Sequence, residues 1–339
     1  MTWRMPAEWE PHQRCLMAWP TRRDLWNHHL DEARREYVAT AVAIASFEPV
    51  VMIAAPDDAA GARSMLPADV EVIEIPIDDS WIRDSGPIFA VGRAAGAGAG
   101  AGERSGADFA FNSWGEKFEP WDQDALVGRR VLEHLGVQRR PSSMVLEGGS
   151  ITVDGAGTAI TTVQCNRHPN RNPGMSREEV ESELASMLGL DTVIWLPWGL
   201  IEDLDTDGHV DNVCTFVRPG VVLAHGAGDD SSHPNHARMS ANLAVLRTSV
   251  DAAGAPLEVI ELPEASYFDI DGELYRNSYL NFYVANGGVV VPIADHPNDA
   301  AALGIIGDAF PDREVVGVPS RVLAYGGGGV HCITQQIPG

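Results

Sequence analysis

The chain has 339 residues, of which 45% are hydrophobic and 21% charged, as is usual for a globular protein with a large apolar core. Its formal net charge of −24 repels nucleic acid and anionic membrane surfaces and attracts small cations, although general acidity for solubility explains the charge equally well. No stretch reaches the roughly 18 apolar residues of a membrane span, and no apolar segment follows Met1, so neither a membrane protein nor a secreted protein is expected.

The first hundred residues are predicted to alternate helix and strand. Residues 31–46 carry apolar side chains at helical spacing, whereas residues 49–54 and 69–76 are rich in β-branched side chains that favour strands. An Ala/Gly-rich stretch at residues 92–106 is predicted to be a mobile surface loop at the tip of a hairpin.

Two turns then carry a carboxylate beside glycine. The segment WIRDSGP places Asp84 in a turn between two strand-like runs, with Trp81 just before it. The segment LEGGS places Glu147 against a glycine pair, directly ahead of a short strand. Loops and strand ends are where a rigid scaffold usually carries its chemistry, so both carboxylates are candidate functional groups.

Helices and strands continue to alternate through the rest of the chain. Helices are predicted at 122–135, 176–188 and 236–253, the second starting with a capping box formed by Ser176 and Glu179. This alternation predicts an α/β fold, and no exact internal repeat is visible. Further strands are predicted at 158–163, 193–196, 213–217, 221–224, 257–261, 279–284, 289–292 and 315–318.

The segment DTDGHVDN places an imidazole and a carboxylate two residues apart. If a strand begins near Gly208 and runs to Val217, His209 and Asp211 point to the same face of that strand. A base and a carboxylate then share one surface.

A run of four glycines, Gly326–Gly329, precedes Val330, His331 and Cys332. Glycine lets a backbone approach a ligand closely, so a thiol directly after this run is a candidate nucleophile. The alternative is that Cys332 is a small buried hydrophobic residue, as most free cysteines are.

The remaining cysteines and the single lysine argue against several common kinds of functional site. Cys15, Cys165 and Cys214 form no C-x-x-C pair with one another or with Cys332, which argues against a zinc ribbon or a thioredoxin-like site. Lys117 is the only lysine and lies in no Walker A motif. Free thiols suit the cytoplasm, which is the expected location.

One thiol, one imidazole and three carboxylates therefore lie beside glycines. Several carboxylates would raise the pKa of a nucleophilic thiol, unless the substrate itself brings a positive charge. A guanidinium group fits, because it is planar, always charged and matches carboxylates in bidentate geometry. The pattern predicts an enzyme that acts on a guanidinium group.

The chain resembles the agmatine deiminases of the Porphyromonas-type peptidylarginine deiminase family from Trp9 to its C-terminus. The resemblance rests on the segments WIRDSGP, LEGGSI, NRNP, DTDGHVDN, NFYVANGGVVVP and GGGGVHCITQQ. It implies the pentein fold, a five-bladed α/β-propeller of ββαβ units, as a single domain over residues 1–339. The family usually has Asn-Ile where this chain has Gly329 and Val330, which implies a more flexible loop before Cys332.

The resemblance also implies a role for each candidate residue. Cys332 is the expected nucleophile and His209 the general acid and base, with Glu147 orienting the imidazole. Asp84 and Asp211 are expected to hold the guanidinium group. Trp81 is expected to line the carbon chain of the substrate. Apart from the resemblance, one residue of the acidic run Glu202, Asp203 and Asp205 could hold the distal amine of the substrate, with Asp205 as the candidate, or the run is only a solvated loop.

The implied reaction is a two-step covalent hydrolysis without a metal or other cofactor. Agmatine would yield N-carbamoylputrescine and ammonia, a step towards putrescine and the polyamines. Arginine and peptidyl-arginine remain alternative substrates. The sequence leaves open whether the chain forms a homo-oligomer.

Two other functions are weaker alternatives. Asp207, His209 and Asp211 match the D-x-H-x-D pattern of manganese ureohydrolases, but the second aspartate cluster of that family is incomplete at residues 266–271. An acidic polyamine-binding protein would leave Cys332 without a function.

Overall fold

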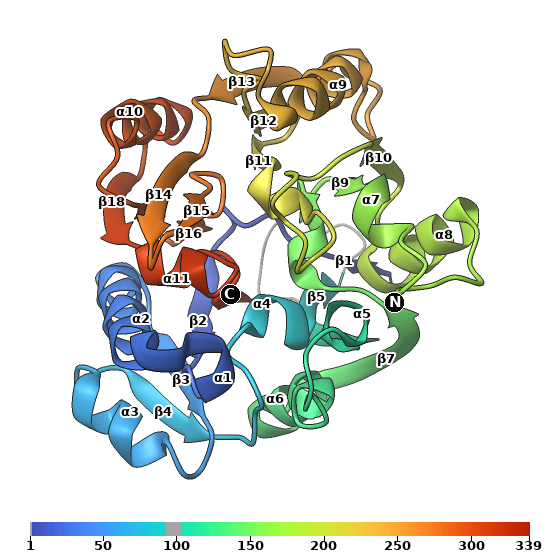
Figure 1. The fold of residues 1–339 in the computed structure, drawn as a ribbon. Coiled ribbons are helices and arrows are strands. Elements are labelled where there is room, and N and C mark those ends of the chain that lie inside the picture. The colour runs from blue at the N-terminus through green and yellow to red at the C-terminus, as the bar shows by residue number, and fades with distance from the viewer. Residues whose placement is uncertain (1, 93–102) are drawn as a thin grey trace.

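A computed structural model describes residues 2–92 and 103–339, and it has a mixed α/β fold (Figure 1). Within this part of the chain, five sheets are built in the same order. An antiparallel pair of strands is followed by a helix and then by a strand parallel to the second strand of the pair. The helices of these units lie at the periphery in Figure 1, and the strands lie closer to the centre.

The five units share this β-β-α-β order and are listed here with their bounds. The first unit consists of β19 (Thr334–Pro338), β2 (His12–Ala18), α2 (Leu30–Ala45) and β3 (Val50–Ala54), and the second of β5 (Ile88–Gly92), β6 (Arg104–Ala110), α6 (Val127–Leu135) and β7 (Gln138–Val145). The third consists of β8 (Ile151–Val153), β9 (Thr158–Thr162), α8 (Arg177–Leu188) and β10 (Thr192–Leu196), and the fourth of β11 (Cys214–Arg218), β12 (Val221–His225), α9 (Pro234–Thr248) and β13 (Glu258–Leu262). The fifth consists of β16 (Tyr283–Val284), β17 (Gly288–Ile293), α10 (Asp299–Ala309) and β18 (Glu314–Pro319).

Shorter elements connect or extend these units. They are β1 (Trp3–Arg4), α1 (Arg23–Trp26), η1 (Asn27–His29), α3 (Ala59–Met65), β4 (Glu71–Glu74), α4 (Ile82–Ser85), α5 (Ser113–Glu116), η2 (Asp124–Leu126), η3 (Gly148–Ser150), α7 (Val163–Asn166), η4 (Val210–Asn212), β14 (Ser266–Ile270), β15 (Glu273–Asn277) and α11 (Arg321–Tyr325).

The first unit joins the two ends of the chain. Strand β19 is antiparallel to β2, with Thr334 opposite Met17, so the last strand completes the sheet that the first residues begin. Strand β3 is buried along its whole length, as expected for a strand with parallel neighbours on both sides. Helix α2 covers this sheet with buried Ala33, Tyr37 and Ile44, which recur at helical spacing.

Several predicted elements are confirmed. Helix α2 lies within one residue of the predicted range 31–46, and strands β3, β9 and β10 occupy their predicted positions. The capping box of α8 is present, because the backbone nitrogen of Glu179 donates to Ser176 Oγ and the nitrogen of Ser176 donates to the Glu179 carboxylate.

Other predictions are wrong. Strand β11 begins at Cys214 rather than near Gly208, because residues 210–212 form the 3-10 helix η4. Helix α9 ends at Thr248 rather than at residue 253. Of the predicted loop 92–106, Gly92 ends β5 and residues 104–106 belong to β6, while residues 93–102 lie outside the described residues.

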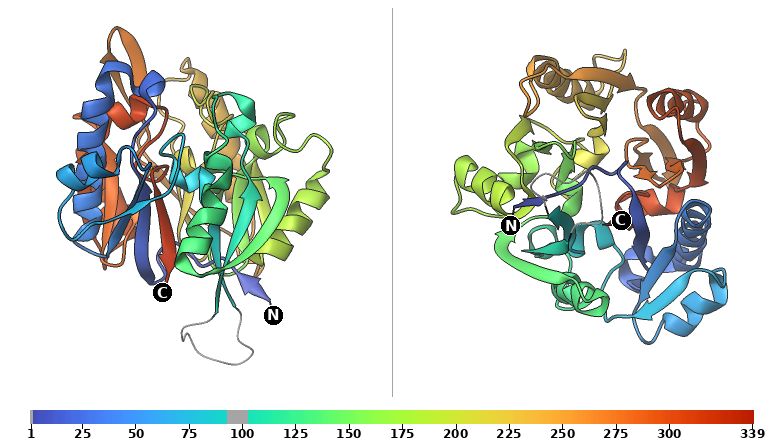
Figure 2. Two further views of the ribbon diagram at one scale, coloured as in Figure 1. Left: turned by 90° about the horizontal axis from the view of Figure 1, so that it is seen from below. Right: turned by 180° about the vertical axis from the view of Figure 1, so that it is seen from behind.

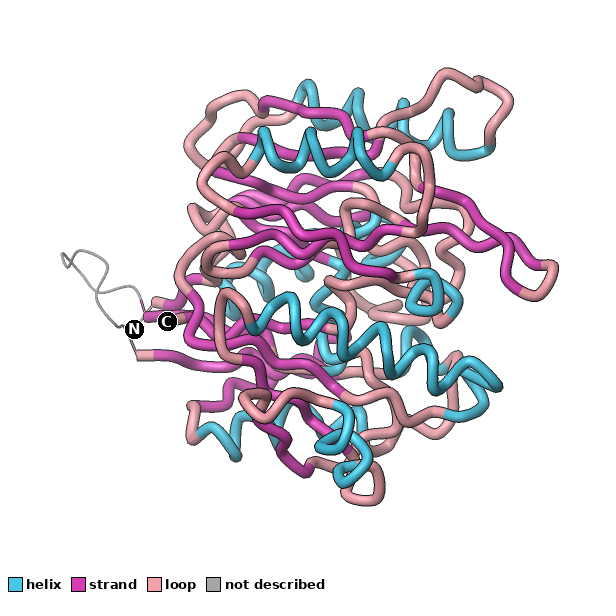
Figure 3. The backbone as a smooth tube through the Cα atoms, turned by 90° about the vertical axis from the view of Figure 1, so that its left-hand side faces the viewer, coloured by secondary structure: helices cyan, strands magenta, loops and turns pink. Residues whose placement is uncertain are grey.

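The hairpin β14–β15 projects from the body at the end opposite the chain termini, as Figures 2 and 3 show. Its two strands pair only with each other in the described structure. No helix within the described residues is both long and apolar enough to span a membrane.

Candidate active site

The candidate residues lie in short segments that each precede the first strand of one unit. Asp84 lies in α4 before β5, Glu147 and Gly149 lie before β8, and Asp211 lies in η4 before β11. Cys332 lies two residues before β19. The repeated chain path therefore brings residues distant in sequence to one place.

Gly149 lies where these segments meet. Its backbone nitrogen donates a hydrogen bond to Asp84 Oδ1 at 2.9 Å. A Cβ atom at this position would lie 2.6 Å from His209 Nδ1, 2.9 Å from Asp211 Oδ2 and 3.0 Å from Asp84 Oδ1. Only glycine permits this approach, so the glycine pair after Glu147 has a packing reason.

His209 is completely buried between two carboxylates. Its Nδ1 is 3.8 Å from Asp84 Oδ2 and its Nε2 is 3.6 Å from Glu147 Oε2. Burial lowers the pKa of His209, but Asp84, Cys165 and Glu147 together raise that pKa well above its ordinary value. The imidazole is therefore protonated in the unliganded site and can donate a proton.

Glu147 is held as an anion behind the imidazole. Burial alone would raise the pKa of Glu147, but the guanidinium of Arg171, with Nε 2.6 Å from Glu147 Oε1, and His209 lower it below its usual range. The other end of Arg171 binds Asp207 Oδ2 at 3.0 Å. Glu147 is thus fixed in place and faces His209.

Asp84 and Asp211 have opposite electrostatic environments. Burial, together with Asp211 and Glu147, raises the pKa of Asp84 against the opposing effect of His209. Its Oδ2 accepts a hydrogen bond from Trp114 Nε1 at 2.9 Å. Burial also opposes ionisation of Asp211, but a hydrogen bond from His331 and the nearby cations outweigh it and lower the pKa of Asp211.

The thiol of Cys332 is buried near Asp211. Its Sγ lies 3.7 Å from Asp211 Oδ2 and 3.3 Å from Asn281 Oδ1, which also accepts from the Cys332 backbone nitrogen. Burial, Asp211 and Asp84 raise the pKa of Cys332 well above its ordinary value. This environment favours the neutral thiol over the thiolate.

A pocket with an empty volume of about 380 Å³ opens onto these groups. Trp81 and Trp114 form aromatic walls, Asp84 and Cys332 lie in its lining, and Asp205 lines it as well. Trp81 packs against Trp26, with ring centroids 5.8 Å apart, and touches the glycine run at Gly328, where a Cβ atom would be 2.4 Å from the Trp81 ring. The pocket suits a cation attached to an apolar chain.

The structure places each predicted site residue around this pocket or its buried groups. Asp84, Trp81, Asp205 and Cys332 line the pocket directly. Three further residues lie behind the lining. His209 is close to Asp84, and Asp211 is close to Cys332. Glu147 is close to His209. The strand geometry predicted for His209 and Asp211 is wrong, yet both side chains face Gly149 because the turn before η4 and η4 itself position them.

Sequence reasoning missed a chain of buried groups behind Asp211. His331 Nδ1 is 2.9 Å from Asp211 Oδ2, and His331 Nε2 is 2.7 Å from Glu8 Oε1. Burial and Arg83 lower the pKa of His331, but Glu8 and Asp211 raise it overall. The only sequence signal was the position of His331 next to Cys332, and nothing in the sequence pointed to Glu8.

Asn281 and Arg171 were also missed as individual residues. Both lie in segments that carry the family resemblance, NFYVANGG for Asn281 and NRNP for Arg171. The resemblance therefore marked these segments but assigned no function to either residue. Asn281 holds Cys332 through two contacts, and Arg171 holds Glu147.

Cys165 and Asp207 bear on two alternative interpretations of the site, a second reactive thiol and a metal site. Cys165 lies within 4.8 Å of Glu147 and His209, but it is fully buried and does not belong to the described residues that line the pocket. Asp207, the first residue of the D-x-H-x-D pattern, pairs with Lys117 at 2.8 Å and with Arg171 at 3.0 Å. Its carboxylate is therefore committed to cations of the protein and does not join His209 and Asp211 in a metal site.

Known proteins resemble the chain over nearly its whole length. The chain is 44% identical to an agmatine deiminase from Ectopseudomonas mendocina, over 98% of this chain and 95% of that protein. It is 42% identical to an agmatine deiminase from Medicago truncatula, with 98% and 96% covered. A solved structure of the agmatine deiminase of Enterococcus faecalis superposes with a TM-score of 0.92 at 34% identity, over 99% of this chain and 96% of that one.

The model of the Porphyromonas-type peptidyl-arginine deiminase family matches residues 4–338, nearly the whole chain. This match and the identity to full-length relatives are independent of the geometry described above. The chain belongs to the Porphyromonas-type peptidyl-arginine deiminase family.

Proposed function

We propose that this protein is an agmatine deiminase, which hydrolyses the guanidinium group of agmatine to N-carbamoylputrescine and ammonia. One observation carries the proposal: Asp84, Asp211 and His209 converge around Gly149, and the Cys332 thiol lies 3.7 Å from Asp211 Oδ2 at a pocket with aromatic walls. The full-length relatives that are named agmatine deiminase support the choice of substrate.

The carboxylates of Asp84 and Asp211 bind the guanidinium group in this proposal. Both are buried, and their oxygens would lie 3.0 Å (Asp84) and 2.9 Å (Asp211) from a Cβ atom at Gly149, so a planar cation placed there can donate hydrogen bonds to both carboxylates. Trp81 covers the carbon chain of agmatine. Asp205, which lines the same pocket beside Gly327, faces the distal ammonium group.

Binding of the cation prepares the nucleophile. The anions that raise the pKa of Cys332 in the empty site are offset by the guanidinium charge, so the thiol loses its proton to solvent as substrate binds. The thiolate then attacks the central carbon of the guanidinium group and forms a C–S bond. Asn281, which contacts both the sulfur and the backbone nitrogen of Cys332, keeps the sulfur aimed at the pocket.

His209 acts first as an acid and then as a base. Its imidazolium donates a proton to the departing nitrogen, the C–N bond breaks, ammonia leaves, and a cationic thiouronium group remains on Cys332. The neutral imidazole then removes a proton from water as the water oxygen bonds to the same carbon. As that intermediate collapses, the C–S bond breaks and its hydroxyl proton passes to solvent, which releases the neutral ureido product and the thiolate and leaves His209 protonated for the next cycle. Glu147, fixed by Arg171, keeps the imidazole oriented and basic.

The five β-β-α-β units form one five-bladed pentein propeller in this proposal, with residues 1–339 as a single domain. The repeated strand order and the pairing of β19 with β2 support this arrangement. The cytoplasm is the proposed location, because four free thiols suit a reducing compartment.

The test compares three substrates, each with and without excess EDTA, and also follows the release of urea and putrescine. Agmatine, free arginine and a peptide with an internal arginine are each incubated with the enzyme, and ammonia and the ureido product are measured. We expect ammonia and ureido product from agmatine, with kcat/KM far above that of the other two. Preferred turnover of arginine or the peptide would overturn the substrate, and urea with putrescine, lost on chelation, would overturn the thiol mechanism.

A further inference from the structure

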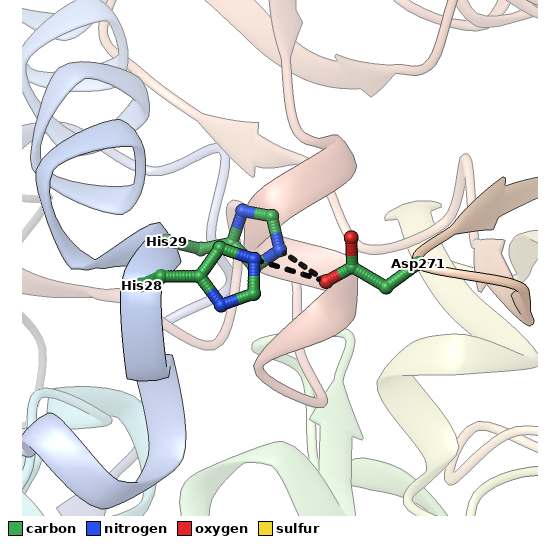
Figure 4. A group of neighbouring side chains, drawn as sticks. All are labelled: His28, His29 and Asp271. Carbon is green, nitrogen blue, oxygen red and sulfur yellow. Dashed lines mark hydrogen bonds and ion pairs between the residues drawn. The ribbon is translucent and has the colours of Figure 1, made fainter.

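A second cluster of metal-ligating groups lies outside the proposed active site. His28 and His29 of η1 both face Asp271, at the tip of the β14–β15 hairpin (Figure 4). Their Nε2 atoms lie 3.1 Å and 2.9 Å from the same oxygen, Asp271 Oδ2. Two segments separated by more than two hundred residues are thus joined by two imidazoles and one carboxylate.

The turn at the tip of the hairpin fixes the backbone position of Asp271. Asp271 and Gly272 have φ values of +56° and +84°, as in the tight two-residue turn that joins β14 to β15. The rings of His28 and His29 contact each other in a tilted arrangement, with centroids 4.0 Å apart and an interplanar angle of 38°. Glu32 Oε2 lies 3.7 Å from His29 Nδ1, so a carboxylate stands behind the imidazole nitrogen that faces away from Asp271.

The spacing fits a small divalent ion. Ligand atoms at about 2.0–2.1 Å from a tetrahedral Zn²⁺ ion lie about 3.3 Å apart. The two nitrogen-to-oxygen distances are slightly shorter than this, and all three ligand atoms lie within 4.8 Å of one another. The side chains of His28 and Asp271 are 69% and 53% exposed to solvent. A small outward movement of these two side chains would admit the ion.

We propose that His28, His29 and Asp271 form a binding site for a divalent transition metal, with Zn²⁺ as the best match. Two imidazoles and one carboxylate are ligands that Zn²⁺ favours, and water occupies the fourth position. Glu32 Oε2, 3.7 Å from His29 Nδ1, would need only a small side-chain movement to accept a hydrogen bond from Nδ1, as carboxylates commonly do behind metal-bound histidines.

The position of this metal site suggests what the ion does. Leu25, just before η1, lines the proposed substrate pocket, and Tyr275 of β15 lines a neighbouring cavity that shares Gly327 and Gly328 with that pocket. Between them lies Tyr325, whose ring centroid is 4.8 Å from that of His29 and 5.2 Å from that of Tyr275. A bound ion would tie the projecting hairpin to η1 at the rim of the pocket.

The test uses Zn²⁺ alone and a Cys332→Ser background, so that neither the catalytic thiol nor turnover affects the result. Calorimetric titration is expected to give one Zn²⁺ per chain. Asp271→Asn and His29→Ala are each expected to weaken binding at least tenfold. The matched control is His134→Ala, which removes an exposed histidine of α6 and should leave the affinity unchanged.

Hydrogen exchange of the hairpin gives the second measurement. Zn²⁺ should slow exchange over residues 266–277 in the Cys332→Ser protein and should have no such effect after Asp271→Asn. Unchanged affinity in both the Asp271 and His29 variants, or the absence of any stoichiometric binding, would overturn the proposal. Circular dichroism checks that each variant is folded, which matters most for His29→Ala, because the His29 side chain is only 14% exposed whereas that of Asp271 is 53% exposed. None of these outcomes depends on the proposed deiminase activity.

Discussion

The residue with the most unusual electrostatic setting is Cys332, a buried thiol next to Asp211 and within reach of the field of Asp84. A thiol nucleophile normally needs a cationic environment. Here the protein supplies anions, and the proposed substrate supplies the cation. This arrangement keeps the thiol unreactive in the empty enzyme and couples its activation to binding.

The first prediction concerns the reactivity of this thiol. Because the pKa of Cys332 lies well above its ordinary value, the thiolate fraction in the free enzyme should rise about tenfold per pH unit from pH 7 to 9. The rate of inactivation by iodoacetamide should rise in parallel, with mass spectrometry locating the label on Cys332. A Cys165→Ala variant should show the same profile, whereas a plateau of the rate below pH 8 would contradict the prediction.

The second prediction concerns Asp84. Replacement by Asn removes one charged partner of the guanidinium group, which is worth roughly 1.5–3 kcal/mol, and should raise KM for agmatine about 10- to 100-fold. Steady-state kinetics of Asp84→Asn measure this change. Glu133→Gln, an equal change of net charge on the exposed face of α6, is the matched control and should leave KM unchanged. A normal KM in Asp84→Asn would remove Asp84 from the binding site.

At the scale of elements, short segments between the strands position the side chains of the proposed active site. The chain Glu8, His331 and Asp211 links the segment after β1 to η4 and to the segment before β19. Arg83 of α4 joins it, with Nη1 3.2 Å from Glu8 Oε1, and its backbone nitrogen donates to the carbonyl of Cys332. Four separate elements are thus held in register by one buried network.

The third prediction follows from this network. Burial would raise the pKa of Glu8, but His331 and Arg83 lower it to about 2. Since the folded-state pKa lies below the unfolded-state value near 4.5, the ionised carboxylate stabilises the fold above about pH 4.5, and that contribution is lost as the pH falls towards 2. Glu8→Gln should therefore lower the free energy of unfolding by roughly 2–3 kcal/mol at pH 7.

Urea unfolding at several pH values tests this sign. The difference between wild type and Glu8→Gln should stay constant from pH 7 to about 4.5 and should shrink at lower pH. A difference that grows as the pH falls would contradict the assignment. Arg129→Gln, which removes an exposed ion pair with Glu133, is the control and should change stability by less than about 1 kcal/mol.

At the scale of the whole molecule, the repeated unit places the site. The segments with Asp84, Glu147, Asp211, Asn281 and Cys332 each precede the first strand of one of the five units described. These segments occupy equivalent positions in the repeated strand order, so each unit contributes one of these side chains. The pairing of β19 with β2 completes this arrangement and holds Cys332 against α4.

The fourth prediction concerns that closing strand. Truncation after Thr334 removes most of β19, leaves one edge of β2 unpaired, and removes buried Ile337 from the core cluster that it shares with Leu16 and Ala18. We expect a loss of activity together with a lower Tm and a broader transition, measured by scanning calorimetry. Removal of Gly339 alone is the control, since this exposed residue lies beyond β19 and should change neither quantity. An unchanged Tm after the longer truncation would show that closure does not stabilise the fold.

The sequence by itself determined the local structure and the set of reacting groups. Apolar spacing predicted α2, the capping box of Ser176 and Glu179 predicted the start of α8, and glycines beside polar residues marked Asp84, Glu147, His209 and Cys332. These features depend on neighbours within a few residues, so periodicity and turn chemistry reveal them.

Only the tertiary structure decided which groups meet and in which protonation state. The network from Glu8 to Asp211, the hold of Asn281 on Cys332, and the meeting of His28 and His29 with Asp271 all join segments far apart in the chain. The pKa values of His209 and Cys332 depend on burial and on charges from other units, which no local pattern contains. Even the predicted strand through His209 and Asp211 was wrong, because packing around Gly149 favours the turn and η4 over local strand propensity.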